Sequence, residues 1–174
     1  MKFSDIPQFT KSRYSCNVSW GYLESQLEQF KDHTTCLVNP LDLNPIYQRG
    51  HVWTVEKQIA YVEYILQGGP SSRLIYWNCS SWGTKYNTPL ELVDGKQRLE
   101  AARAFLRGDI PAFGYKIGEF EGSLRLCGPD FVFCINDLKT QKEVMQWYLQ
   151  LNSGGVVHEE YELERVRKLL RETK

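Results

Sequence analysis

The sequence predicts an α+β fold in which helices pack against a mixed β-sheet. One observation is that segments with apolar residues at helical spacing alternate with short runs rich in β-branched and aromatic residues. A second is that glycine turns separate the later β-rich runs, as in hairpins. A third is that 42% of the 174 residues are apolar, which suffices for the core of one domain. We therefore expect a single domain over residues 1–174.

The first elements follow from apolar spacing and end residues. A helix is predicted over residues 20–31, because apolar residues recur along one face. A strand is predicted over 34–38, which is rich in β-branched residues and ends at an Asn-Pro pair. A second helix is predicted over 55–67, with Thr54 as its N-cap and Gly68 at its end.

The middle of the chain predicts two strands around a loop. Residues 73–77 are apolar and aromatic and predict a strand, whereas 79–88 is rich in Ser, Gly and Asn and predicts an exposed loop. A short strand is predicted over 90–93. It leads directly into a helix predicted over 97–106, which Gly108 ends.

The last third of the chain predicts more β structure and two helices. Aromatic residues and glycine turns between 110 and 126 predict several short β segments, and 131–135 predicts a strand. Apolar spacing predicts a helix over 139–151. The final predicted helix, 159–172, has acidic residues first and basic residues last, which suits the helix dipole and predicts a solvated helix. The alternative is a docking face whose basic end contacts DNA.

Composition limits the partners and the compartment. Lys and Arg total 21, as do Asp and Glu, so the formal net charge is zero. Proteins that wrap DNA usually carry a basic excess, so any DNA contact would come from a local basic patch, and a bound nucleotide fits the balance better. The five cysteines lack Cys-x-x-Cys spacing, and neither a signal peptide nor a membrane-spanning run is present. We expect free thiols in a cytoplasmic protein, the host cytoplasm if a phage encodes it, with no membrane partner.

The residues around Gly95 carry the most information about function. A predicted strand ends there and a helix begins, and glycine can take a positive φ and lets a ligand approach the backbone closely. The first N–H groups of a helix lack intrahelical partners and form an anion site with the helix dipole. Lys96 and Arg98 put positive charge where it opposes the dipole, and a docked anion would explain them. The sequence thus predicts a phosphate cradle over residues 94–98.

Asp94 permits two interpretations. It is either an N-cap that accepts hydrogen bonds from the first helical turn, or a group that binds a metal or orients a nucleophile beside the phosphates. Local physics alone leaves both open.

A second polar segment surrounds Gln48 and Arg49. The planar guanidinium suits phosphate, and Gln48 can orient a water or a base. Tyr47 or Trp53 either stacks on a base or anchors the loop in the core. The alternative for a lone Gln-Arg pair is simple solvation at the surface.

A third segment is Asn-Ser-Gly-Gly at residues 152–155. It is either a helix C-cap or a second backbone nest that faces the same ligand through Asn152 and Gly154.

These three segments, in this order and spacing, resemble the GmrSD-type family of the ParB/sulfiredoxin superfamily. The family's first motif is similar to Pro-Ile-Tyr-Gln-Arg at 45–49, and its Asp-Gly-Gln-Gln-Arg motif is similar to Asp-Gly-Lys-Gln-Arg at 94–98. Its Asn-x-Gly-Gly turn resembles residues 152–155, and residues 95–102 resemble the Gly-x-x-Arg-x-x-Ala phosphate motif of ParB proteins. The resemblance covers about residues 40–165.

The resemblance implies a ParB/sulfiredoxin-like fold that binds an NTP such as ATP, GTP or CTP, with Mg²⁺. By carry-over, Asp94, Gln97 and Gln48 are the expected catalytic residues, and Asp94 is the expected Mg²⁺ ligand. The residues expected to bind the phosphates or the nucleotide are Gly95, Lys96, Arg98, Arg49, Asn152 and Gly154.

The sequence departs from the family pattern at several points. Lys96 replaces the usual first Gln of the second motif, and His158 stands where a capping Ser is common. Relatives usually continue into an HNH-type nuclease domain, for which a chain of 174 residues has no room. We therefore expect a standalone N-terminal domain without the HNH nuclease part.

Three function classes follow. The first is an enzyme acting on a phosphoanhydride, an NTPase or kinase-like phosphotransferase in DNA-related metabolism or phage–host conflict, favoured by the acidic residue beside the cradle. The second is a regulatory module that binds nucleotide, DNA or a partner protein without chemistry. The third is a small ParB-like nuclease, which would need Asp94 and Glu91 on one metal. Residues three apart in a strand point to opposite faces, which argues against that pair.

Overall fold

The computed structural model describes residues 2–33, 40–48, 50, 52–124, 129–152 and 160–173. Within these residues the helices are α1 (Leu23–His33), α2 (Val55–Leu66), α3 (Lys96–Leu106), α4 (Gln141–Asn152) and α5 (Glu160–Glu172). The strands are β1 (Tyr14–Val18), β2 (Leu41–Asp42), β3 (Leu74–Asn78), β4 (Leu90–Asp94) and β5 (Phe131–Asn136).

The strands form one mixed sheet in the order β1-β5-β3-β4-β2. The central strand β3 runs parallel to β5 and antiparallel to β4. At the two edges, β1 pairs antiparallel with β5 and β2 pairs parallel with β4. A mixed sheet with packed helices is the predicted fold class, which is confirmed. The more specific ParB/sulfiredoxin-like assignment stays a prediction.

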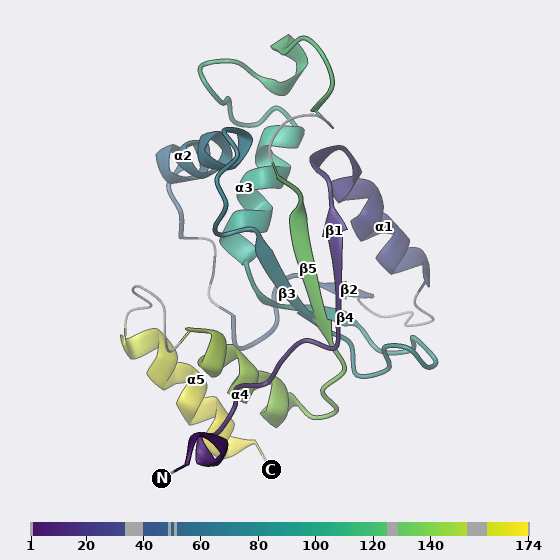
Figure 1. The fold of residues 1–174 in the computed structure, drawn as a ribbon, viewed down its shortest axis with the longest axis vertical. Helices are drawn as coiled ribbons and strands as arrows, with labels where there is room; N and C mark the ends of the chain where they lie inside the picture. The colour runs from purple at the N-terminus through teal and green to yellow at the C-terminus, as the bar shows by residue number, and fades with distance from the viewer. Residues whose placement is uncertain are drawn as a thin grey trace.

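Helices cover both faces of the sheet. The larger apolar cluster joins residues of α1, α2 and α3 to the sheet, and a smaller one joins α4 and α5. Strand β4 contributes to both, because Leu92 packs into the first cluster and Val93 into the second. Figure 1 shows α4 and α5 side by side at the end of the molecule opposite α2 and residues 110–124.

Two helices begin and end where the sequence predicts. Thr54 is the N-cap of α2, and its hydroxyl accepts the N–H of Lys57 at 3.4 Å. Gly68 follows α2 with a φ of 88°, and Gly108 follows α3 with a φ of 76°. Both values lie in the left-handed region that glycine takes at helix ends.

The prediction of several β segments between residues 110 and 126 is wrong for the described part, 110–124. This stretch holds one isolated β-bridge, between Ala112 and Tyr115, and a 3-10 turn over Ile117–Glu119. The aromatic rings that indicated strands pack on one another instead: Tyr115 lies 6.0 Å from Phe120 between centroids. Both remain largely exposed, so they line no sheet face. The predicted strand 34–38 lies outside the described residues.

The loop at 79–88 is less exposed than its composition predicts, because Cys79 and Ser81 are 3% and 8% exposed. Cys16, Cys79 and Cys134 are free thiols, as expected, while the other two cysteines lie outside the described residues.

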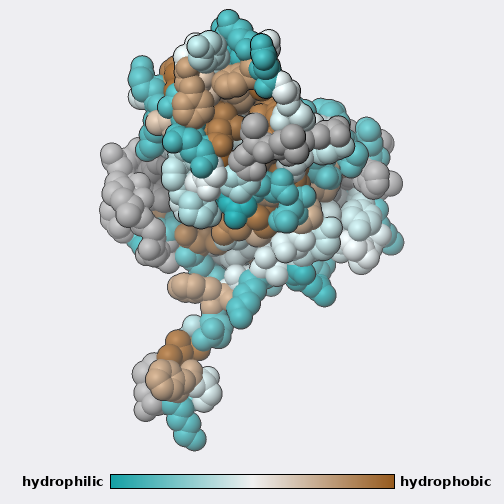
Figure 2. Space-filling view, turned by 45° about the horizontal axis from the view of Figure 1, so that its top comes forward, coloured by the Kyte–Doolittle hydropathy of each residue, from teal (hydrophilic) through white to brown (hydrophobic). Residues whose placement is uncertain are grey.

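The N-terminal segment ends beside α5 in Figure 1 and forms a narrow projection in the turned view of Figure 2, and its Phe3 is 93% exposed. In the described part of the chain, every helix is too short or too polar to cross a membrane.

Candidate functional site

The turn between β4 and α3 is built on Gly95, whose φ is 102°. A Cβ at this position would lie 2.8 Å from Cδ1 of Ile75 on β3. Glycine is therefore required by the left-handed φ and by the strand that passes behind the turn. The carbonyl of Gly95 accepts the N–H of Leu99 at 2.9 Å, so the N–H groups before Leu99 precede the first hydrogen bond of α3.

Asp94 and Arg98 form an ion pair across this turn. Nη2 of Arg98 donates to Oδ2 of Asp94 at 2.5 Å, and the side chains are 21% exposed for Arg98 and 25% for Asp94. Among the described residues, Nε of Arg98 is buried without a hydrogen-bond partner. Gly95, not Asp94, is the N-cap of α3, and among the described residues no side-chain hydrogen bond caps this helix, which corrects the interpretation of Asp94 as the cap.

The charges of this ion pair affect the pKa values of two nearby tyrosines. Burial raises the pKa of Tyr61, and the positive charge of Arg98 opposes the rise. Burial also raises the pKa of Tyr76, with Cys134 and Asp94 adding to the rise and Arg98 opposing it. The pair thus lies beside two phenols that stay neutral at physiological pH.

Lys96 places a second positive charge at the start of α3. Its Nζ donates to Oδ1 of Asn44 at 2.5 Å, which joins the helix to the segment before the first motif. The first turn of α3 therefore carries two cations beside its free N–H groups, an arrangement that suits a bound anion, while the carboxylate of Asp94 occupies one of the cations.

Gln97 holds the loop that follows the first motif. Its Oε1 accepts the N–H of Val52 at 3.0 Å and of Trp53 at 3.1 Å, and its Nε2 donates to the carbonyl of Gly50 at 3.1 Å. Because two backbone donors meet Oε1, the orientation of the carboxamide is fixed. Gln97 is 7% exposed, and these three bonds give it a positioning role.

The backbone of the first motif is held from two sides. Nε2 of Gln48 donates to the carbonyl of Leu92 at 2.6 Å. Arg165 of α5 donates to the carbonyls of Ile46 at 3.2 Å, Tyr47 at 3.1 Å and Gln48 at 3.1 Å. Sequence reasoning missed Arg165, because nothing local distinguishes it from the other charges of its helix.

Tyr47 anchors the first motif in the core, since its side chain is fully buried. Its hydroxyl donates to Oε2 of Glu91 at 3.1 Å, and Nδ2 of Asn78 donates to Oε1 at 3.2 Å. Burial raises the pKa of Glu91, while these two hydrogen bonds lower it. Tyr47 belongs to the α4–α5 cluster, so Glu91 is tied to that side of the sheet.

The remaining predicted site residues lie apart or outside the described residues. Asn152 ends α4, is 7% exposed, and donates through Nδ2 to the carbonyl of Tyr148 in the same helix at 2.7 Å. Arg49 and Gly154 lie outside the described residues. Over the described ranges, no three His, Cys, Asp or Glu side chains gather to hold a metal ion.

Comparison with known proteins identifies one family. The model described as GmrSD restriction endonuclease, N-terminal domain, matches residues 28–127, a stretch that contains the first two motifs. No curated protein and no solved structure matches the chain.

Proposed function

This chain belongs to the family of GmrSD restriction endonuclease N-terminal domains, and from that membership we propose that it binds an NTP at residues 94–98 and cleaves or transfers a phosphoryl group. The family resemblance seen in the first two motifs is thereby confirmed. The family is named for a restriction endonuclease, and we infer for this chain a restriction-type setting in which DNA is the expected partner.

The observation that carries the proposal is the guanidinium of Arg98 beside the Gly95 turn. It is held by a single carboxylate, is part exposed, and keeps one buried N–H without an acceptor among the described residues. A phosphate at the helix N-terminus offers this guanidinium more oxygens than Asp94 does, and in a bidentate geometry. Phosphate binding would then exchange one anionic partner of Arg98 for another.

This exchange gives Asp94 its role. Once released, its carboxylate lies beside the phosphates, where it can orient the attacking hydroxyl or water. It can also contribute one oxygen to Mg²⁺, which binds through one or two carboxylates together with substrate phosphates. The single carboxylate at this turn therefore fits the expected metal only when the nucleotide supplies further oxygens. Mg²⁺ would offset the phosphate charge.

The other residues act through position. Lys96 adds a second positive charge to the first turn of α3. Gln48 holds the first motif against β4, and Gln97 holds the loop that follows this motif against α3. Arg49, carried on that motif, is the expected second arginine at the phosphates. The catalytic effect would come from charge stabilisation and alignment.

A thermal-shift panel of ATP, GTP, CTP and ADP with Mg²⁺, followed by product analysis, tests the proposal. A ligand at about 100 times its Kd stabilises by ~2.7 kcal/mol, which for a chain of this size raises Tm by about 5–10 °C. Arg98→Ala should lose the shift. The matched control is Arg107→Ala, because Arg107 pairs with Asp109 at the far end of the same helix and should keep it.

Asp94→Asn separates binding from chemistry. It removes the carboxylate that competes for Arg98, so the nucleotide should bind at least as tightly while product formation stops. Asp109→Asn is the matched control and should leave both unchanged. Normal turnover by Asp94→Asn, or a full shift in Arg98→Ala, would overturn the mechanism. A full shift without product over hours in the unmodified protein would favour the non-catalytic regulatory module.

A further inference from the structure

We propose that a pocket between α1 and the 79–88 loop binds a single-ring nitrogen heterocycle. The pocket has a volume of about 130 Å³. Its walls come from Phe30 of α1, Trp82 and Tyr86 of the loop, and Leu90 at the start of β4. None of the residues of the 94–98 turn lines it, and the proposal stands apart from nucleotide binding there.

The size of the pocket sets the size of its ligand. A protein cavity of about 150 Å³ lined by apolar side chains accepts one benzene molecule. At 130 Å³ this pocket therefore holds one aromatic ring.

The walls of the pocket are aromatic. Trp82 is the centre of the group, with ring centroids 5.5 Å from Tyr86 and 6.1 Å from Phe30, both edge-on. Because these rings meet edge to face, they present differently oriented surfaces to the space between them. Aromatic surfaces favour a flat guest that can stack or meet them edge-on.

Two glutamine carboxamides at the pocket favour a ring that carries hydrogen-bonding groups over a hydrocarbon ring. Gln26 and Gln29, one turn apart on α1, both line it. Within the described part of the chain, neither carboxamide has a hydrogen-bond partner. A carboxamide offers both a donor and an acceptor. The pair suits a ring that carries donors and acceptors at its edge, such as a pyrimidine base, over a plain hydrocarbon ring.

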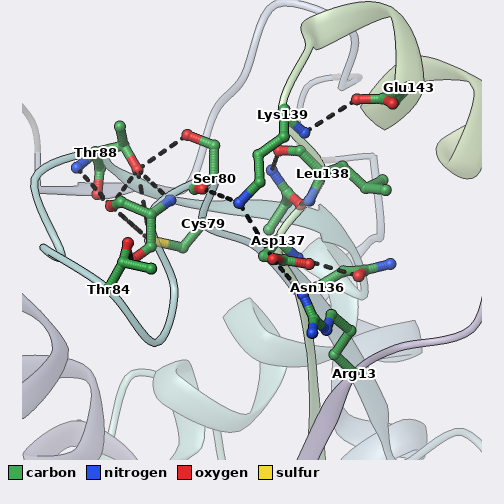
Figure 3. Close-up of polar contacts among 12 residues, drawn as sticks. Arg13, Cys79, Ser80, Thr84, Thr88, Asn136, Asp137, Leu138, Lys139 and Glu143 are labelled. Atoms are coloured by element: carbon green, nitrogen blue, oxygen red, sulfur yellow. Dashed lines mark hydrogen bonds and ion pairs between the residues drawn. The ribbon is translucent and has the colours of Figure 1, made fainter.

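The loop that carries Trp82 and Tyr86 is held in place before any ligand arrives. Ser81 and Thr88 close it, because each backbone N–H donates to the other's hydroxyl at 3.1 Å and the two hydroxyls lie 2.7 Å apart. Ser80 also donates to the Thr88 hydroxyl at 3.1 Å, and Figure 3 shows the side chains of Cys79, Ser80 and Thr88 converging there. A preformed wall lowers the entropy cost of binding.

The pocket and the 94–98 turn lie at opposite ends of β4. Leu90 begins the strand and Asp94 ends it, which separates the two by about 13 Å of extended chain. A ligand in the pocket can therefore be distinguished from one at the turn by substitution.

Titration calorimetry and ligand-observed NMR with cytosine and uracil, against toluene as an apolar ring of similar size, test the proposal. The pyrimidines should bind the full chain, and Trp82→Ala should weaken them about tenfold or more, the usual loss of one stacking partner. Gln26→Leu should weaken the pyrimidines and spare toluene. Two substitutions should leave the affinity for the pyrimidines unchanged: Gln146→Leu, at an exposed glutamine on α4, and Arg98→Ala, outside the pocket.

Several results would overturn the proposal. One is no pyrimidine binding at millimolar concentration. Another is binding of toluene alone, which would refute the ligand class. A third is pyrimidine binding that Arg98→Ala removes and Gln26→Leu leaves intact, which would move the ligand to the turn. If Trp82→Ala fails to fold, Gln26→Leu, an exchange at a half-buried helix surface, still decides the outcome.

Discussion

Gln97→Met separates a positioning role from a catalytic one. Methionine keeps the length and apolar character of the side chain but can neither accept the two N–H groups nor donate to the carbonyl of Gly50. The substitution therefore removes the three bonds that hold the loop at residues 50–53 and leaves the packing of α3 nearly unchanged.

The expected loss follows from those contacts. Each hydrogen bond contributes a net ~0.5–1.5 kcal/mol, and three of them give about 1.5–4.5 kcal/mol. Part of this is recovered by water, because Val52 is 51% exposed and its freed N–H can be solvated. Trp53 is half-buried, so its N–H carries more of the loss. We expect a reduction near 2 kcal/mol in the free energy of unfolding, at the low end of that estimate.

Urea denaturation followed by circular dichroism measures the global effect, and amide hydrogen exchange measures the local one. The amides of Val52 and Trp53 should exchange about ten- to a hundredfold faster, since 1.4 kcal/mol corresponds to tenfold. Gln146→Met on the exposed surface of α4 is the control and should stay within about 0.5 kcal/mol. Unchanged stability and exchange together with abolished turnover would refute positioning and assign Gln97 to the chemistry.

Three further predictions follow from single contacts. Gly95→Ala should cost about 1–3 kcal/mol in thermal or urea unfolding, because its φ is left-handed and the added Cβ meets β3, whereas Gly118→Ala, with open space around it, should be nearly neutral; equal effects would contradict this. Arg165→Lys should lower the free energy of unfolding by ~1 kcal/mol and speed amide exchange at 46–48, because an ammonium cannot reach the three carbonyls that the planar guanidinium contacts. Unchanged exchange would contradict the role of Arg165 in holding this segment. Burial raises the folded-state pKa of Glu91 above its ordinary 4.5, so its contribution is present at low pH and is lost as pH rises through the folded pKa. The stability of the unmodified chain relative to Glu91→Gln should therefore fall as the pH rises above about 4.5 in urea titrations, and a constant difference would rule out the raised pKa.

Elements defined by local pattern could be predicted from the sequence. The helix at α2 was predicted from its Thr54 cap and its terminal glycine, and both act as expected. The junction of β4 and α3 was predicted from the glycine between them, although the structure adds the close approach of β3 as a second reason for that glycine. These features depend on residues within a few positions of one another.

Features that depend on distant residues could not be predicted in the same way. The aromatic residues at 110–124 indicated strands, but no neighbouring strand pairs with them in the described residues, and they pack as rings. Gln97 carried the pattern of a catalytic residue, and only the folded chain shows its side chain bonded to the backbone of the loop that follows the first motif. The partner of Arg98 was likewise unpredicted, because Asp94 lies in a strand where helix spacing does not apply.

The hydrogen bonds from Arg165 to the backbone of residues 46–48 also have a consequence for biosynthesis. Its carbonyl acceptor at Tyr47 lies 118 residues earlier in the chain, so a ribosome must add that many amino acids before the loop is secured. At ~5–20 residues per second this takes roughly 6–24 seconds, during which residues 46–48 have left the peptidyl-transferase centre without their final hydrogen bonds. A nascent chain would therefore present this segment to cellular proteases and chaperones until translation of α5 is complete.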